Sequence, residues 1–140
     1  MKKLLLFAFL FVSFSTFAQK VEKDLKYYYY NLDQDKDFMA YLKAKKNFEI
    51  KQFDFKLPAS KEAVKEIEEN QAKILKSERS YAAFLNRYGM KNAGEYAELW
   101  FNQMDALKTF IKKNPEFYNL SPKERQNIID KWYYNNVASN

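Results

Sequence analysis

The stretch NAGEYAELWFNQMDALKTFIKKNP, residues 92–115, decides the fold of this chain. Its apolar residues recur every three or four positions, which is the spacing of one face of an α-helix. That face comprises Tyr96, Trp100, Met104, Leu107 and Ile111, and Leu99 and Phe110 widen it on one side. A face this broad is typical of a central helix that packs against several neighbours.

The ends of this segment carry their own signals. Asn92 and Glu95 have the spacing of a capping box at a helix start. Lys112 and Lys113 complement the partial negative charge of a helix C-terminus, and Pro115 cannot continue the helix. We therefore predict a helix from about residue 93 to residue 113.

A single long helix is predicted before it, from Lys61 to Tyr88. Ser60 can cap its start, and Gly89 follows its last turn, where a left-handed residue is favoured. Gln71 and Glu78 interrupt the apolar stripe, which otherwise reads Val64, Ile67, Ile74, Tyr81, Leu85 and Tyr88. Either the stripe rotates so that Leu75 replaces them, which the 3.6-residue period favours, or they form a polar layer against a partner helix.

The third long helix is predicted from Ser121, because SPKE supplies a cap, a proline at the first helical position and a glutamate at the third. Ile128, Ile129, Trp132 and Tyr133 are expected to face inward. The polar residues 135–140 are expected to form a frayed tail.

The N-terminal half gives weaker patterns. A helix is expected from about Gln34 with Phe38, Tyr41 and Leu42 inward, and the alternation in FEIKQFDFKLP, residues 48–58, predicts an extended strap across the bundle. In KYYYYN, residues 26–31, helical spacing puts Tyr28 and Tyr29 on one face with two leucines and displays Tyr27 and Tyr30 on the other.

The composition supports an all-α fold. The chain has two glycines and three prolines in 140 residues, fewer than the turns of a β-rich domain require. We expect a small helical bundle of three long helices plus an N-terminal helical segment.

The first twenty residues, MKKLLLFAFLFVSFSTFAQK, have the pattern of a secretory signal peptide. Two lysines precede an apolar run that is shorter than the roughly 20 residues of a membrane-spanning helix. Thr16 and Ala18 occupy positions −3 and −1 of a cut before Gln19. We therefore expect residues 1–18 to be removed, leaving residues 19–140 as one helical domain that is periplasmic or secreted and does not span a membrane.

The absence of histidine and cysteine excludes several chemistries. It removes thiol nucleophiles, imidazole bases and His or Cys zinc sites. DQDKD, residues 33–37, resembles the opening of a calcium loop, but Phe38 and Ala44 stand where that loop needs glycine and glutamate. No cofactor, metal or catalytic residue is therefore predicted.

The net charge of the whole chain is +6, and Lys2 and Lys3 contribute two of these charges, so residues 19–140 carry +4. Such a charge could favour anionic lipid, lipopolysaccharide or acidic partners, but the charges are interspersed and form no basic block, which favours simple solubility as their explanation. Nucleic acid binding would require a concentrated basic stripe, which the sequence lacks.

The candidate contacts are aromatic residues that fall off the apolar helix faces, because exposed rings anchor protein partners or stack on sugars. They are Tyr27, Tyr30, Phe84, Phe101 and Tyr134. The alternative is that each packs against a second neighbouring helix. Glu78 is the one carboxylate whose position on an apolar stripe makes a raised pKa worth testing.

The function expected from these features is a non-enzymatic binding or adaptor protein of the bacterial cell envelope, whose partner is another envelope protein. The alternative is a periplasmic holdase-type chaperone, whose helices open to bind many unfolded clients. An enzyme based on carboxylates or tyrosine is the third alternative, and it would require a deep pocket with convergent side chains.

Overall fold

The computed structural model of the protein describes residues 23–138. The predicted signal peptide and its cut between Ala18 and Gln19 lie outside the described residues. Within residues 23–138 the chain is helical and forms no strand, so the predicted all-α class is confirmed. No helix in this range combines the length and the hydrophobicity that crossing a membrane requires.

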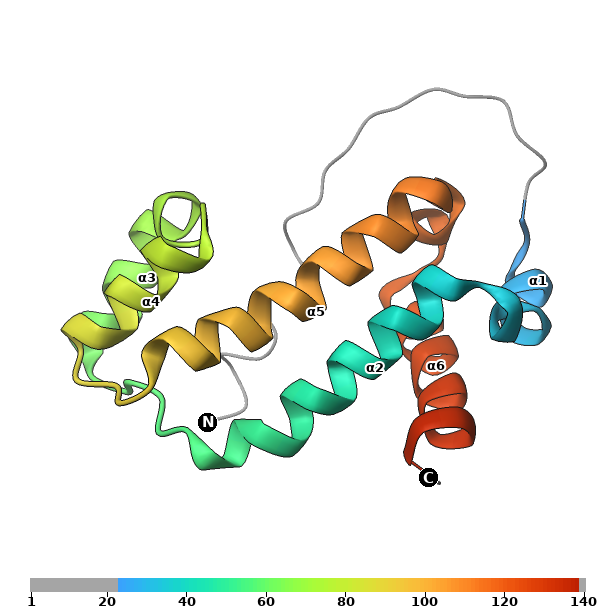
Figure 1. The fold of residues 1–140 in the computed structure, drawn as a ribbon. Coiled ribbons are helices and arrows are strands. Elements are labelled where there is room, and N and C mark those ends of the chain that lie inside the picture. The colour runs from blue at the N-terminus through green and yellow to red at the C-terminus, as the bar shows by residue number, and fades with distance from the viewer. Residues whose placement is uncertain (1–22, 139–140) are drawn as a thin grey trace.

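The helices gather in two groups, one at each end of a central helix pair (Figure 1). They are α1 (Leu25–Tyr30), α2 (Lys36–Lys51), α3 (Lys61–Ile74), α4 (Glu78–Arg87), α5 (Ala93–Lys113) and α6 (Pro122–Tyr133). Short 3-10 turns are η2 (Leu32–Gln34), η3 (Gln52–Asp54) and η4 (Pro115–Asn119). A π-helical turn, η5 (Tyr134–Ala138), follows α6, so the prediction of a frayed tail from residue 135 is wrong as far as Ala138.

The antiparallel pair of α2 and α5 forms the middle of the fold. The rings of Phe38 and Phe110 lie 5.1 Å apart at one end of the pair. The rings of Phe48 and Tyr96 lie 5.4 Å apart at the other end. Because the start of α2 therefore meets the end of α5, the two helices run in opposite directions side by side (Figure 1).

Two apolar clusters form at the two ends of this pair. The first joins α1, α2, the end of α5, η4 and α6; its largest buried members include Tyr28, Phe38, Tyr41, Phe110, Phe117 and Trp132. The second joins the end of α2, α3, α4 and the start of α5; its buried members include Phe48, Ile74, Tyr81, Phe84, Leu85 and Tyr96. The broad face predicted for α5 thus serves both clusters.

The single helix predicted from Lys61 to Tyr88 is wrong. The chain forms α3 and α4, with Leu75 as the C-cap of the first and Ser77 as the N-cap of the second. The Ser77 hydroxyl accepts from the Ser80 amide at 3.1 Å, and the Ser80 hydroxyl accepts from the Ser77 amide at 3.0 Å. This reciprocal cap satisfies amides that a new helix start leaves free, so the break is stabilised locally.

The break folds the predicted stripe back upon itself. The Tyr88 hydroxyl donates to the Glu66 carboxylate at 2.6 Å, so the end of α4 returns to the first half of α3. Gln71 is half-buried in α3, and Glu78 is exposed in the first turn of α4. Gln71 and Glu78 therefore lie in two different helices. Neither the rotated stripe nor the polar layer that was predicted for one continuous helix is formed.

The extended strap predicted for residues 48–58 is largely wrong. Helix α2 continues to Lys51, and η3 follows it directly. Only residues 55–60 lie outside regular structure, and Phe55 and Leu57 pack against the second cluster. Helical packing of Phe48 against Tyr96 therefore prevails over the alternating pattern.

The predicted helix ends have mixed outcomes. Ser60 caps α3, and Ser121 caps α6 in a capping box with Glu124, as predicted. Gly89 follows α4 with a φ of 82°, which is the left-handed conformation predicted for it. The capping box predicted at Asn92 is wrong, because Asn92 has a φ of 56° and its side chain makes no cap hydrogen bond.

One buried polar side chain joins three segments at the first cluster. Asn114 is 1% exposed, and its amide nitrogen donates to the Asp35 carboxylate at 3.2 Å. Its side-chain oxygen accepts from the Lys23 ammonium at 2.6 Å. Asp35 itself caps α2 through the amides of Asp37 and Phe38. Asn114 thus connects the end of α5 to the start of α2 and to the N-terminal segment.

We expect Asn114→Ala to lower the free energy of unfolding by roughly 1–3 kcal/mol, because it removes the hydrogen bonds that Asn114 makes with Asp35 and Lys23. Urea unfolding followed by circular dichroism measures this change. Asn119→Ala is the control, since Asn119 is exposed on η4. Equal losses in the two variants would contradict the linking role of Asn114.

The two glycines are expected to respond to alanine with opposite signs. Gly89→Ala forces a side chain into a positive φ and should cost about 1–2 kcal/mol. Gly94→Ala lies within α5 and should stabilise by about 0.5–1 kcal/mol. A Cβ at either position meets no atom within 4 Å, so thermal unfolding of the two variants isolates the effect of the backbone.

Candidate binding surface

Side chains of α6 hold the N-terminal helix α1 in place by donating hydrogen bonds to its carbonyl oxygens. The Asp24 carboxylate accepts from the Tyr27 amide at 2.8 Å and so caps α1. The Trp132 indole nitrogen donates to the Tyr28 carbonyl oxygen at 2.9 Å. The Tyr28 side chain is fully buried, and its ring lies 5.2 Å from that of Phe117. A helix of only six residues is thereby held in one position against the first cluster.

Lys131 of α6 occupies a cage of aromatic rings at this junction. Its ammonium lies 4.6 Å from the ring centre of Tyr30, 5.1 Å from that of Tyr29 and 5.2 Å from that of Trp132. The same ammonium donates a hydrogen bond to the Tyr29 carbonyl oxygen. Ring faces attract a cation within about 6 Å. Lys131 therefore holds the Tyr29 and Tyr30 side chains against α6.

Two exposed tyrosines accompany this lysine. Tyr30 is 67% exposed and Tyr134 is 64% exposed. The Tyr30 ring contacts the Lys131 ammonium, and Tyr134, the first residue of η5, follows Lys131 by three residues. We define the tyrosine surface as Tyr29, Tyr30, Lys131 and Tyr134. It presents two largely exposed phenol rings, one of them against the held cation.

An open hollow of about 450 Å³ adjoins the tyrosine surface along α1. Its lining residues are Asp24, Leu25, Lys26, Tyr29 and Tyr30. The hollow combines aromatic and aliphatic side chains with one carboxylate and one ammonium. Such a mixture is typical of contact surfaces for proteins, in which aromatic anchors sit beside polar groups.

Tyr133 fixes the orientation of the C-terminal end of α6. The ring of Tyr133 lies 5.8 Å from that of Tyr134. The Lys45 ammonium lies 4.9 Å from the centre of the Tyr133 ring. Partial burial and a hydrogen bond to Glu49 raise the pKa of the Tyr133 hydroxyl to about 12. The Tyr133 hydroxyl therefore stays protonated to higher pH than that of an ordinary tyrosine, and its ring packs against that of Tyr134.

The five predicted contact residues fall into different environments. Tyr30 and Tyr134 are exposed, and Tyr27 is half-buried with its ring 5.3 Å from that of Tyr28. Phe84 is 5% exposed inside the second cluster, so its prediction as an exposed contact is wrong. Phe101 is half-buried, with its ring 5.0 Å from that of Trp100. Tyr30 thus contacts Lys131 and Tyr134 follows that lysine by three residues, whereas Phe84 and Phe101 belong to the second cluster.

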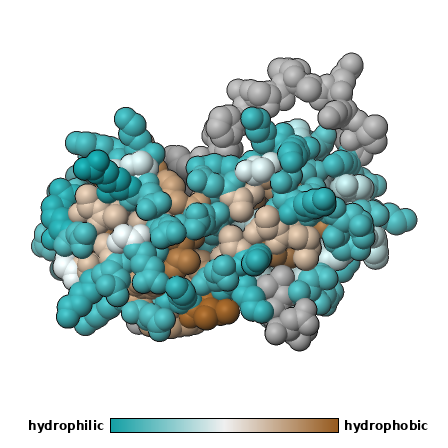
Figure 2. All heavy atoms as spheres, viewed as in Figure 1, coloured by the Kyte–Doolittle hydropathy of each residue, from teal (hydrophilic) through white to brown (hydrophobic). Residues whose placement is uncertain are grey.

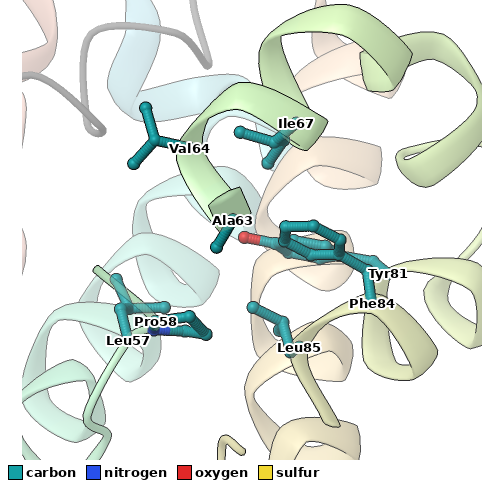
Figure 3. Close-up of a pocket in the computed structure, with 8 residues that line it drawn as sticks. All are labelled: Leu57, Pro58, Ala63, Val64, Ile67, Tyr81, Phe84 and Leu85. Carbon is teal, nitrogen blue, oxygen red and sulfur yellow. The ribbon is translucent and has the colours of Figure 1, made fainter. Parts of the chain in front are cut away.

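The second cluster contains tyrosines whose hydroxyl groups are buried. Burial raises the pKa of Tyr96 to about 12, partly offset by a hydrogen bond with Tyr81. Burial also raises the pKa of Tyr81. The cavity beside Tyr81, between α3, α4 and the segment before α3, has a volume of about 10 Å³ (Figure 3). This volume is near the lower limit for one water molecule.

Sequence reasoning missed Lys131 as part of the tyrosine surface and the role of Trp132 in positioning α1. Trp132 was assigned to the core and is 9% exposed, yet its indole nitrogen positions α1. The sequence offers one signal, which is Lys131 next to Trp132 on α6. This signal does not indicate that α1 supplies the other two rings of the cage. The contact partners of Lys131 are about one hundred residues away in the sequence.

Comparison of the chain with protein-family models, curated proteins and solved structures finds no match. The geometry described above is therefore the basis for a functional proposal.

Raised tyrosine pKa values predict alkaline unfolding. The folded pKa is about 12 for both Tyr96 and Tyr133, against about 10 for an unfolded tyrosine. The unfolded chain then loses these protons first as the pH rises. The corresponding stability is complete below about pH 10 and is lost as the pH rises through about 12.

Urea unfolding at increasing pH, together with phenolate absorbance at 295 nm, checks this expectation. Stability should begin to fall near pH 10, and the last phenolates should appear only as helical circular dichroism is lost. Titration of all eleven tyrosines near pH 10 with unchanged circular dichroism would contradict it.

Proposed function

We propose that the chain is an exported, non-enzymatic binding or adaptor protein of the bacterial cell envelope, which contacts another envelope protein through the tyrosine surface. The observation that carries this proposal is the Tyr30 ring, which is 67% exposed and held 4.6 Å from the Lys131 ammonium, with the exposed Tyr134 three residues after that lysine. Aromatic side chains that are already held in place lose little entropy on binding, so they suit the centre of an interface. Export rests on the signal peptide pattern of residues 1–18.

The small size of the cavity beside Tyr81 favours binding over catalysis. The cavity beside Tyr81 is far smaller than the ligand pockets of about 300–1,000 Å³ that are usual in proteins. Tyr81 and Tyr96 have raised pKa values and so lack the activated phenolate that a tyrosine nucleophile needs. In residues 23–138, no three acidic side chains are grouped closely enough to hold a metal ion.

A cross-linked pull-down of the tagged chain from its own cell envelope, read by mass spectrometry, tests the proposal. One partner in a fixed ratio to the chain is expected. Tyr30→Ser should weaken its capture by roughly thirtyfold, which corresponds to about 2 kcal/mol for an anchor residue. Asn135→Ser is the matched control, because Asn135 is exposed beside Tyr134 and offers no ring.

The alternative functions give different results in the same experiment. A broad set of unfolded envelope proteins, captured equally by the wild-type chain and by Tyr30→Ser, would support a holdase-type chaperone and contradict an adaptor. A single partner whose capture is indifferent to Tyr30 would retain the adaptor and rule out the tyrosine surface as its contact.

A further inference from the structure

A second apolar surface lies at the C-terminal end of α2, opposite the end that meets α1 (Figure 1). Ile50 is 62% exposed and Phe53, in η3, is 86% exposed. Phe48 in the same turn is buried against Tyr96, with the ring centres 5.4 Å apart. Phe48 therefore occupies the face of α2 that packs against α5. Ile50 in α2 and Phe53 in η3 are additional large apolar side chains that remain exposed.

These two side chains are neighbours. They are three residues apart, a spacing that places Cβ atoms about 5–6 Å from each other on a helix. Strongly hydrophobic atoms reach the surface along the lower edge of the molecule, over α2 (Figure 2). With 86% of its surface exposed, Phe53 makes few contacts within its own chain and projects outward. We define this pair, Ile50 and Phe53, as the apolar tip.

The segment that carries the apolar tip has a positive net charge. From residue 43 to residue 56 the chain has five lysines and two carboxylates, an excess of three positive charges. Lys43 lies two turns before Ile50 on the same side of α2, and both Lys43 and Lys56 are exposed.

Ion pairs offset some of this charge. Lys45 pairs with Glu49, and the Lys51 ammonium lies 2.9 Å from the Glu95 carboxylate. Asp54 is the remaining carboxylate within residues 43–56. Lys43 and Lys56 are therefore the cations nearest to the apolar tip in sequence that are both exposed and outside these two pairs.

We propose that the apolar tip and its flanking lysines bind the surface of an anionic lipid bilayer. An isoleucine and a phenylalanine that project from a helix end can enter the boundary between headgroups and acyl chains, while lysines on either side meet the headgroup charges. This activity is independent of the tyrosine surface. The predicted export of the chain would place it beside such membranes.

Charge and shape favour the lipid surface over other occupants. A second copy of this chain would bring lysines of both copies together, which opposes association. A protein partner would need a preformed pocket for each projecting side chain, whereas a fluid bilayer needs none. An acidic bilayer satisfies both the apolar and the cationic parts of the surface.

Co-sedimentation with lipid vesicles tests the proposal. The full chain is mixed with vesicles of phosphatidylcholine, with or without phosphatidylglycerol. We expect at least tenfold tighter binding to the anionic vesicles and weaker binding at high salt. Phe53→Ser should reduce binding about tenfold or more through the lost apolar burial. Lys43→Glu and Lys56→Glu should each reduce it at least fivefold.

Matched variants separate the apolar tip from the rest of the chain. Asn47→Ser changes an exposed side chain on the preceding turn, and Lys76→Glu reverses an exposed charge between α3 and α4. Both should bind as the wild-type chain does. All variants share residues 1–22, so any lipid affinity of that segment is common to them. The proposal is overturned if Phe53→Ser binds like the wild-type chain, if neutral and anionic vesicles bind equally, or if neither binds.

Discussion

The antiparallel contact between α2 and α5 is the interaction on which the rest of the structure depends. Phe38 meets Phe110 at one end of it, and Phe48 meets Tyr96 at the other. Each meeting point is the start of an apolar cluster, to which α1 and α6, or α3 and α4, add their own side chains. In the absence of cysteine, no disulfide can replace this packing, so the two clusters are held together by side-chain contacts along one pair of helices.

Sequence patterns predicted helices well where apolar spacing and end signals agreed. The α5 segment and the SPKE start of α6 have both, and these helices begin and end as predicted, although the capping box expected at Asn92 does not form. The long helix across residues 61–88 was predicted wrongly because the apolar positions before and after the break keep one helical register, while the local cap at Ser77 and Ser80 competes with helix continuation. Apolar spacing alone does not reveal such a break, because the buried faces of two helices that pack against each other can follow the same period along the sequence. The contact from Tyr88 back to Glu66 is what only the folded chain reveals.

The exposure of single aromatic residues was harder to predict than their helix face. Phe84 lies off the main stripe of its helix, yet a second helix covers it. Tyr30 lies off its stripe and remains exposed, with the Lys131 ammonium of α6 over its ring. The difference depends on how many neighbours each helix has, which is a property of the fold. The lysine that holds the Tyr30 ring was equally invisible, since it comes from the other end of the chain.

The shallow attachment of α3 has a dynamic consequence. Within α3 only Ala63 and Ile74 are buried, and the backbone of Asn70 departs from helical geometry. Its free energy of local opening should therefore be well below that of global unfolding. Amide hydrogens of α3 would then exchange through detachment of this helix alone, and such a detached state would uncover Tyr81, Phe84 and Leu85 of α4 while α2 and α5 stay paired (Figure 3). The folded ensemble of this protein would then include a minor form with one helix undocked.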